Sequence, residues 1–225
     1  MLKPKRKILR QEIEQDPFIE KIFSIKQHFE LHKKFYLRSI AGFAGTLLII
    51  SLLLRSQSTN ANNASIALNK AMVFMAQKDD SNAMIFLQEA NDNYSNTDAG
   101  LDASYYLGKI HFDKKDYIVS ENYLKNYTNK GNNKLLLGAS CQLLAYIFRI
   151  YGDLENAIKY QKLQLKYLKS NKDKAYANIN IAKLSFEMGD AQFALALINK
   201  VIDENSDNFD IIQLAEQASG GLLVK

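Results

Sequence analysis

The sequence predicts an all-α protein with one membrane-spanning helix near its N-terminus, followed by about four helix-turn-helix units. Two observations carry this prediction. One is a stretch of 20 residues with a single charge, at positions 35–54, and the other is a pattern of small and turn-forming residues that recurs every 37 positions from residue 64 onward. Apolar residues make up 47% of the 225 positions and charged residues 24%, an ordinary balance for a globular protein. Wholesale disorder is therefore excluded.

For residues 1–34, before the span, the sequence predicts a basic cytoplasmic tail and an amphipathic helix. Five Lys or Arg residues in the first 15 positions suit attraction to anionic lipid headgroups. Asp16 can cap a helix and Pro17 fits its first position, and apolar residues at 18, 22, 25 and 29 then recur at helical spacing. We expect this helix to lie at the cytoplasmic face of the membrane and to run into the span.

Residues 35–54 predict the transmembrane helix. Twenty helical residues span about 30 Å, the thickness of the hydrocarbon core of a bilayer. A helix of a soluble protein would show a polar stripe, which this segment lacks, and a cleaved signal peptide would have a shorter apolar core, so a core helix and a signal peptide are both disfavoured. Ten Lys or Arg residues occur up to Arg38, whereas only Arg55 occurs between there and Lys70. The positive-inside rule therefore places the N-terminus in the cytoplasm and the chain after Arg55 across the membrane.

After a polar linker at residues 55–63, residues 64–225 predict four repeat units and a final capping helix near residues 209–219. The units begin at Ala64, Leu101, Gly138 and Ala175. Their eighth residues are Ala71, Gly108, Ala145 and Ala182, and their twentieth residues are Ala83, Ser120, Ala157 and Ala194. Their twenty-fourth residues are Leu87, Leu124, Gln161 and Ile198. Small side chains at positions eight and twenty predict that the two helices of each unit approach closely across a Lys-Asp or Gly-Asp turn.

This pattern resembles the tetratricopeptide repeat (TPR), which implies a TPR α-solenoid. The stretch at residues 93–127, which runs into the second unit, together with one span close to the N-terminus, is similar to the YfgM-like ancillary subunits of the Sec translocon. The resemblance implies a protein of the bacterial inner membrane whose repeat domain faces the periplasm, beside the translocon, and meets periplasmic chaperones or exported clients. An assembly or scaffold factor for another envelope complex, in cell division or cell-wall synthesis, remains the alternative.

In repeats of this kind the first helices line a groove, and here these helices alternate aromatic residues with cations, which suits an extended peptide. The residues that we expect to contact a partner are Tyr105, Lys109, Phe112, Tyr146, Arg149, Tyr176 and Lys183. Leu68, Met72, Met75, Ile179 and Phe186 occupy equivalent positions. The alternative for each aromatic residue is that it packs neighbouring units together.

Several function classes are disfavoured by the same sequence. The net charge of +5 arises entirely before residue 56, where 11 Lys or Arg residues face 5 Asp or Glu, so the repeats lack the basic surface of a nucleic-acid-binding protein. The single cysteine, Cys141, excludes an internal disulfide and lies in an apolar run typical of a buried residue.

Catalytic and metal-binding motifs are equally absent. No phosphate-binding loop, nucleophile elbow or paired carboxylates are evident, so we expect neither catalysis nor a cofactor. His28 and His32 lie one helical turn apart, a spacing that can bind a metal, but no third ligand is evident and we expect both on a solvated face.

Overall fold

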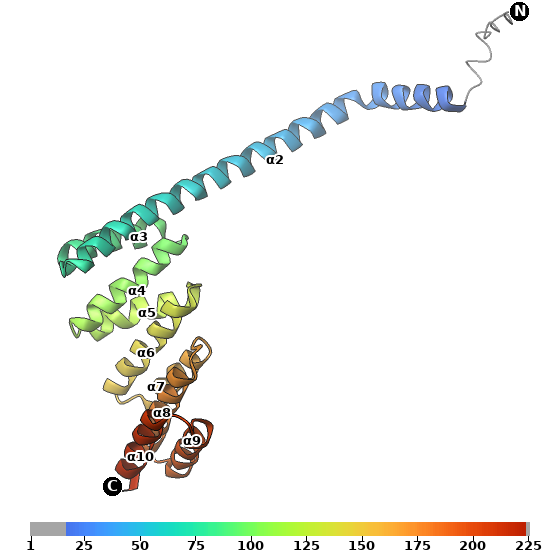
Figure 1. Cartoon of the computed structure of the whole chain (residues 1–225). Coiled ribbons are helices and arrows are strands. Elements are labelled where there is room, and N and C mark those ends of the chain that lie inside the picture. Colours follow the sequence, from blue (N-terminus) through green and yellow to red (C-terminus); the bar gives the residue numbers. More distant parts are fainter. Residues whose placement is uncertain (1–16, 224–225) are drawn as a thin grey trace, which may run out of the picture. The chain divides into compact units, whose positions relative to one another are not determined.

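The computed structural model describes residues 17–223, and every regular element in that range is a helix (Figure 1). The predicted basic tail lies outside the described residues. The chain divides into two compact units, Met1–Ser56 and Gln57–Lys225. The all-helical prediction is confirmed for the described residues.

The first described helix, α2, runs over Pro17–Ala76 and begins at the predicted proline. Residues 55–63, expected as a linker, are helical and continuous with the span. The sequence has neither glycine nor proline from position 46 to position 99, so nothing in it ends the helix at Arg55.

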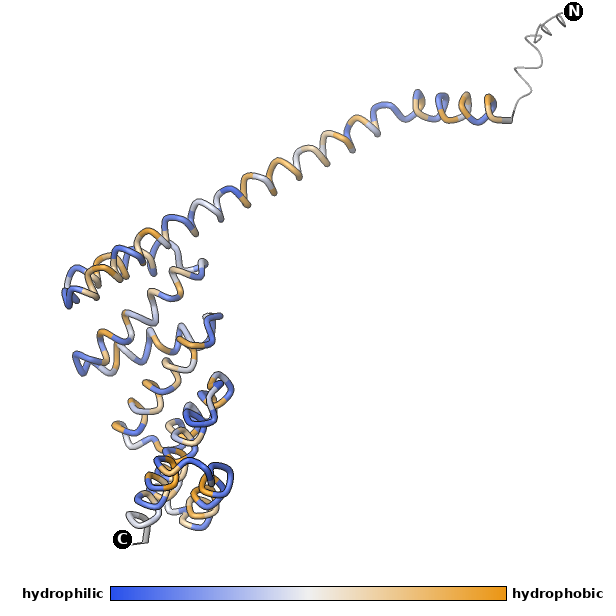
Figure 2. The backbone as a smooth tube through the Cα atoms, viewed as in Figure 1, coloured by the Kyte–Doolittle hydropathy of each residue, from blue (hydrophilic) through white to orange (hydrophobic). Residues whose placement is uncertain are grey.

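Among the described residues, α2 is the one helix long and apolar enough to cross a membrane. Its large apolar side chains in the predicted span are exposed, with Leu48 at 61% and Leu53 at 64%. Figure 2 shows this stretch as mostly hydrophobic between hydrophilic residues on either side. Such exposure of apolar side chains is costly in water and favourable in a bilayer.

The compact unit Gln57–Lys225 is built from helices that pack in chain order, each against the next. The last turns of α2 pack with α3, and the following helices form the pairs α4–α5, α6–α7 and α8–α9 before a final α10. Their bounds are α3 Asp80–Tyr94, α4 Asp98–Asp113, α5 Tyr117–Lys130, α6 Lys134–Ile150, α7 Leu154–Leu165, α8 Asn171–Glu187, α9 Ala191–Glu204 and α10 Phe209–Leu223. The final helix covers the stretch predicted to close the repeats.

The turn inside each pair has the same geometry at an interval of 37 residues. One residue of each turn adopts a left-handed backbone, with φ of 59°, 62°, 75° and 97° at Lys78, Lys115, Gly152 and Gly189. The next residue is always aspartate, and its backbone N–H donates to the carbonyl five positions back at 2.9 Å. Three of the four aspartates also cap the following helix by accepting a backbone N–H, namely Asp79, Asp153 and Asp190. The period predicted from the sequence is thus present in the backbone.

We expect Lys115→Gly to stabilise the fragment Gln57–Lys225 by about 1 kcal/mol, because a left-handed backbone is strained for lysine and not for glycine. The reciprocal change Gly152→Ala should destabilise it by about 1 kcal/mol or more. A Cβ at Gly152 meets nothing within 4 Å, so this cost comes from the backbone alone. Urea unfolding of the fragment Gln57–Lys225 measures both changes. A loss of stability in Lys115→Gly would contradict the argument.

The small residues at positions eight and twenty lie where the two helices of a pair meet. A Cβ added at Gly108 would lie 2.8 Å from Leu124 Cγ, and the Ser120 hydroxyl donates to the Gly108 carbonyl at 2.7 Å. All four residues at position twenty are fully buried, as are Leu87, Leu124 and Ile198 at position twenty-four. The predicted close approach of the helices is therefore confirmed.

Three buried clusters form the core of this unit. The first joins α2, α3 and α4 around Leu87 and Leu107. The second is centred on Tyr127 and Leu144, and the third joins α8, α9 and α10. Burial raises the pKa of the Cys141 thiol to about 12, so this thiol stays protonated at neutral pH and packs as a small apolar side chain.

Candidate partner-binding groove

A groove lies between α6 and α8, with α7 as its floor. It consists of two adjoining cavities of about 390 and 150 Å³. Both cavities are lined by Gln142 of α6, Gln161 of α7 and Asn180 of α8, so they form one continuous depression. A third cavity of about 260 Å³ shares Lys183 with the second and continues the groove between α8 and α10.

Four of the seven predicted contact residues line this groove. Tyr176 lines the larger cavity, near the N-terminal ends of α6 and α8, whereas Tyr146, Arg149 and Lys183 line the smaller one toward their C-terminal ends. Tyr146 is half exposed, at 51%. The 37-residue period places these side chains on corresponding faces of successive first helices, which explains why they meet around the same groove.

Arg149 is held by a partner within the chain. Its guanidinium donates through Nε and Nη2 to the two carboxylate oxygens of Glu187, with the Nε–Oε2 distance at 3.2 Å. This two-point ion pair joins the C-terminal ends of α6 and α8 at the end of the smaller cavity. Two parallel hydrogen bonds between a guanidinium and a carboxylate fix the relative orientation of the two groups. Arg149 therefore links α6 to α8.

The other three predicted residues, all on α4, lie outside the cavities of this groove. Tyr105 is only 7% exposed and packs in the core against Tyr106 and Tyr127, so it offers no free surface to a partner. Lys109 pairs with Asp113 at 2.8 Å, one helical turn away. Phe112 is half-buried, and its ring meets Tyr146 edge-on with centroids 5.3 Å apart. Phe112 therefore packs against a residue that lines the groove.

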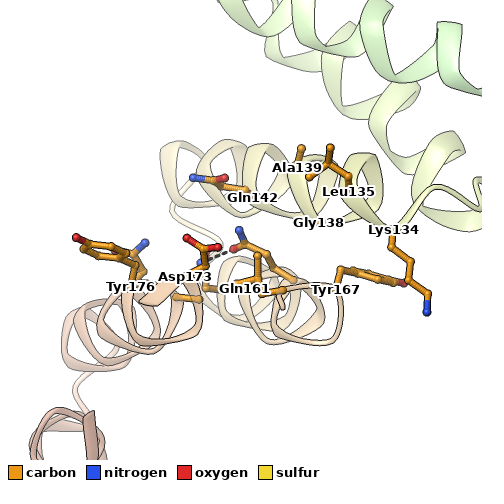
Figure 3. Close-up of a pocket in the computed structure, with 13 residues that line it drawn as sticks. Lys134, Leu135, Gly138, Ala139, Gln142, Gln161, Tyr167, Asp173 and Tyr176 are labelled. Carbon is orange, nitrogen blue, oxygen red and sulfur yellow. Dashed lines mark hydrogen bonds between the residues drawn. The ribbon is translucent and has the colours of Figure 1, made fainter. Parts of the chain in front are cut away.

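The floor of the groove holds two residues that the sequence prediction did not include among the contact residues. Gln161 and Gln164 of α7 are 4% and 7% exposed, and Gln161 Nε2 donates to Gln164 Oε1 at 2.7 Å. Tyr167, after α7, and Asp173 of α8 also line the larger cavity (Figure 3). One signal was available in the sequence, since Gln161 occupies the twenty-fourth position, where the other three units carry leucine or isoleucine.

The charges around the groove nearly balance. Lys134 and Asp173 line the larger cavity, and Lys183 lines the smaller one beside the Arg149–Glu187 pair. In the part of the chain that the structure describes, no group of three His, Cys, Asp or Glu side chains could hold a metal ion. The surface is therefore suited to non-covalent binding through aromatic faces and neutral amides.

No family model matches the chain, and the search of curated proteins finds no match either.

Proposed function

We propose that this protein is a non-enzymatic, membrane-tethered scaffold of the TPR type that binds other proteins in the α6–α8–α10 groove. The observation that carries the proposal is the groove itself, which is open and continuous across three helices and lined by partly exposed tyrosines and a lysine. Aromatic residues and arginine are enriched in protein-binding surfaces, and Tyr146, Tyr176 and Arg149 line this groove.

The apolar helix supports the tethering part of the proposal. A helix that can cross a bilayer, followed in the same chain by a unit with a binding groove, holds that unit near the membrane surface. From the resemblance to YfgM-like subunits, we place the groove on the periplasmic side of a bacterial inner membrane, near the Sec translocon, where exported chains and chaperones would be its partners.

Site-specific photo-crosslinking in intact cells tests this function. A photoreactive phenylalanine analogue at Tyr146, in the groove, should give crosslinked products that include translocon subunits, chaperones or exported proteins. The matched control is the same analogue at Phe193 of α9, an aromatic residue with 41% exposure whose ring lies under Lys162 and which lines none of the three cavities of the groove. Equal products from both positions would show that the groove is not the binding surface. Products containing only division or cell-wall proteins would favour the alternative envelope complex.

The proposed orientation predicts which residues a membrane-impermeant thiol reagent can reach. In a Cys141→Ala background, Ser58→Cys should be labelled from outside the cell, because it follows the span on the side with few cations. Gln11→Cys precedes the span and should be labelled only after the membrane is made permeable. Labelling of Gln11→Cys in intact cells would reverse the orientation and remove the groove from the periplasm.

A further inference from the structure

The floor of the groove contains an amide pair where the repeat pattern calls for an aliphatic side chain. Leu87, Leu124 and Ile198 are fully buried at the twenty-fourth position of their units, whereas the third unit has Gln161 there. Burying a carboxamide in place of a leucine is unfavourable unless its polar atoms find partners. Among the described residues, Ser140 Oγ is the one buried polar side-chain atom without a hydrogen-bond partner, so the unpaired amide atom of Gln161 is open to the cavity that this residue lines, where a bound group can reach it.

The hydrogen bond between Gln161 and Gln164 satisfies only half of this pair. One amino group and one carbonyl oxygen are used in that bond, which leaves one carbonyl oxygen and one amino group without a partner within residues 17–223. This remainder is the same when both amides are turned together. Both side chains are more than nine-tenths buried and both line the larger cavity.

Two further amides face the same space from the walls. Gln142 of α6 and Asn180 of α8 are exposed, line both cavities and make no side-chain hydrogen bond in the described structure. Figure 3 shows Gln142 on α6 on one side of the cavity, with Gln161, Asp173 and Tyr176 on the other. Gln142, Gln161 and Asn180 thus meet where the two cavities join, and Gln164 lines the larger cavity beside Gln161.

We propose that these four amides, Gln142, Gln161, Gln164 and Asn180, recognise the main chain of an extended polypeptide segment that lies along the groove. Each peptide unit carries one N–H donor and one C=O acceptor, which complements the free acceptor and donor of the buried pair. Neutral amides provide both functions without selecting a charged side chain, so this binding depends little on the sequence of the segment. The proposal rests on the protein-binding function above and names the form of its partner.

The dimensions of the groove suit such a segment. The groove follows α6 from Lys134 to Arg149, about 22 Å at 1.5 Å per helical residue. An extended chain covers that length with about six or seven residues. Tyr176 and Tyr146 lie toward opposite ends of it, where their rings can contact apolar side chains of the segment.

The test uses the full chain in nanodiscs and, as probe, reduced and carboxymethylated α-lactalbumin labelled with a fluorophore, with empty nanodiscs as the blank. Fluorescence anisotropy should show binding that is nearly unchanged between 50 and 300 mM NaCl. The variant Gln161→Leu/Gln164→Leu should bind about tenfold more weakly, or worse, because it removes the donor and the acceptor that face the groove. It should melt no lower than the wild type, because leucine restores the aliphatic pattern of the other units.

Two further variants complete the design. Gln192→Leu makes the same substitution at an exposed position of α9 and should bind the probe like the wild type. Gln142→Ala/Asn180→Ala removes only exposed side chains from the walls, so it tests the site even if the leucine variant unfolds, and we expect about threefold weaker binding.

The outcomes separate this proposal from the function on which it rests. Unchanged probe binding by both amide variants overturns main-chain recognition but leaves the groove as a binding surface. Equal binding of native α-lactalbumin, or a tenfold loss of binding in salt, also overturns it, in favour of a folded or a charged partner. An amide variant that changes only the oligomeric state shows that a second copy of the chain occupies the groove. Absence of crosslinks at Tyr146 in cells, in contrast, contradicts the proposed function itself.

Discussion

Phe43→Arg/Leu47→Arg should release the protein from the membrane. These residues lie one helical turn apart in the middle of the predicted span, and both side chains are more than half exposed. An arginine at the centre of a membrane helix costs about 2.5 to 3.5 kcal/mol on insertion scales, so two of them cost about 5 to 7 kcal/mol. A loss of this size removes most of the advantage of inserting the segment.

Extraction of membranes with alkaline carbonate measures this effect. The wild type should stay in the pellet and the variant should move to the supernatant or be degraded. The matched control is Asn62→Arg/Ile66→Arg, which places two arginines with the same spacing on exposed positions of α2 beyond the span and should stay in the pellet. If the Phe43→Arg/Leu47→Arg variant resists extraction like the wild type, the span hypothesis is wrong.

The fold was largely predictable because its determinants are local. Three features recur in the sequence every 37 residues. They are a turn residue with a left-handed backbone, an aspartate that begins the next helix, and a small residue at a helix contact. The continuity of α2 through residues 55–63 was less apparent, because polar residues there suggested a linker. The absence of glycine and proline was the better guide to the backbone.

The site was only partly predictable because it depends on how the units are packed against one another. The Lys109–Asp113 pair follows from spacing along one helix, but the Arg149–Glu187 pair joins residues 38 positions apart and requires the register of α8 against α6. Tyr105 and Tyr106 are adjacent aromatics, and the sequence does not say which one enters the core. Gln161 was visible as an exception to the repeat, yet only the cavities above it give the exception a meaning.

Tyr127→Ala should be among the most destabilising single substitutions in the fragment Gln57–Lys225. The ring is fully buried in the central cluster, close to Tyr105, and a Cβ added at Gly131 would lie only 2.6 Å from it. Removing a buried aromatic ring costs about 3 to 5 kcal/mol through lost burial and the cavity left behind. Urea unfolding of Gln57–Lys225, followed by circular dichroism, should show this loss. Tyr151→Ala, which removes a tyrosine that is 45% exposed, should cost below about 1 kcal/mol.

The variant Tyr127→Phe isolates the phenol hydroxyl, which donates to Asp102 Oδ1 at 2.9 Å. Burial raises the pKa of Asp102, and this hydrogen bond partly offsets the rise by favouring the carboxylate. Because the pKa of Asp102 is raised in the folded state, the free energy of unfolding falls as pH rises and Asp102 ionises. This loss of stability is larger when the Tyr127 hydroxyl, which stabilises the carboxylate, is removed. Tyr127→Phe should therefore destabilise by about 1 to 2 kcal/mol at pH 7 and by less at pH 4, where Asp102 is more protonated. An equal loss at both pH values would mean that the hydroxyl does not stabilise the carboxylate and acts only through packing.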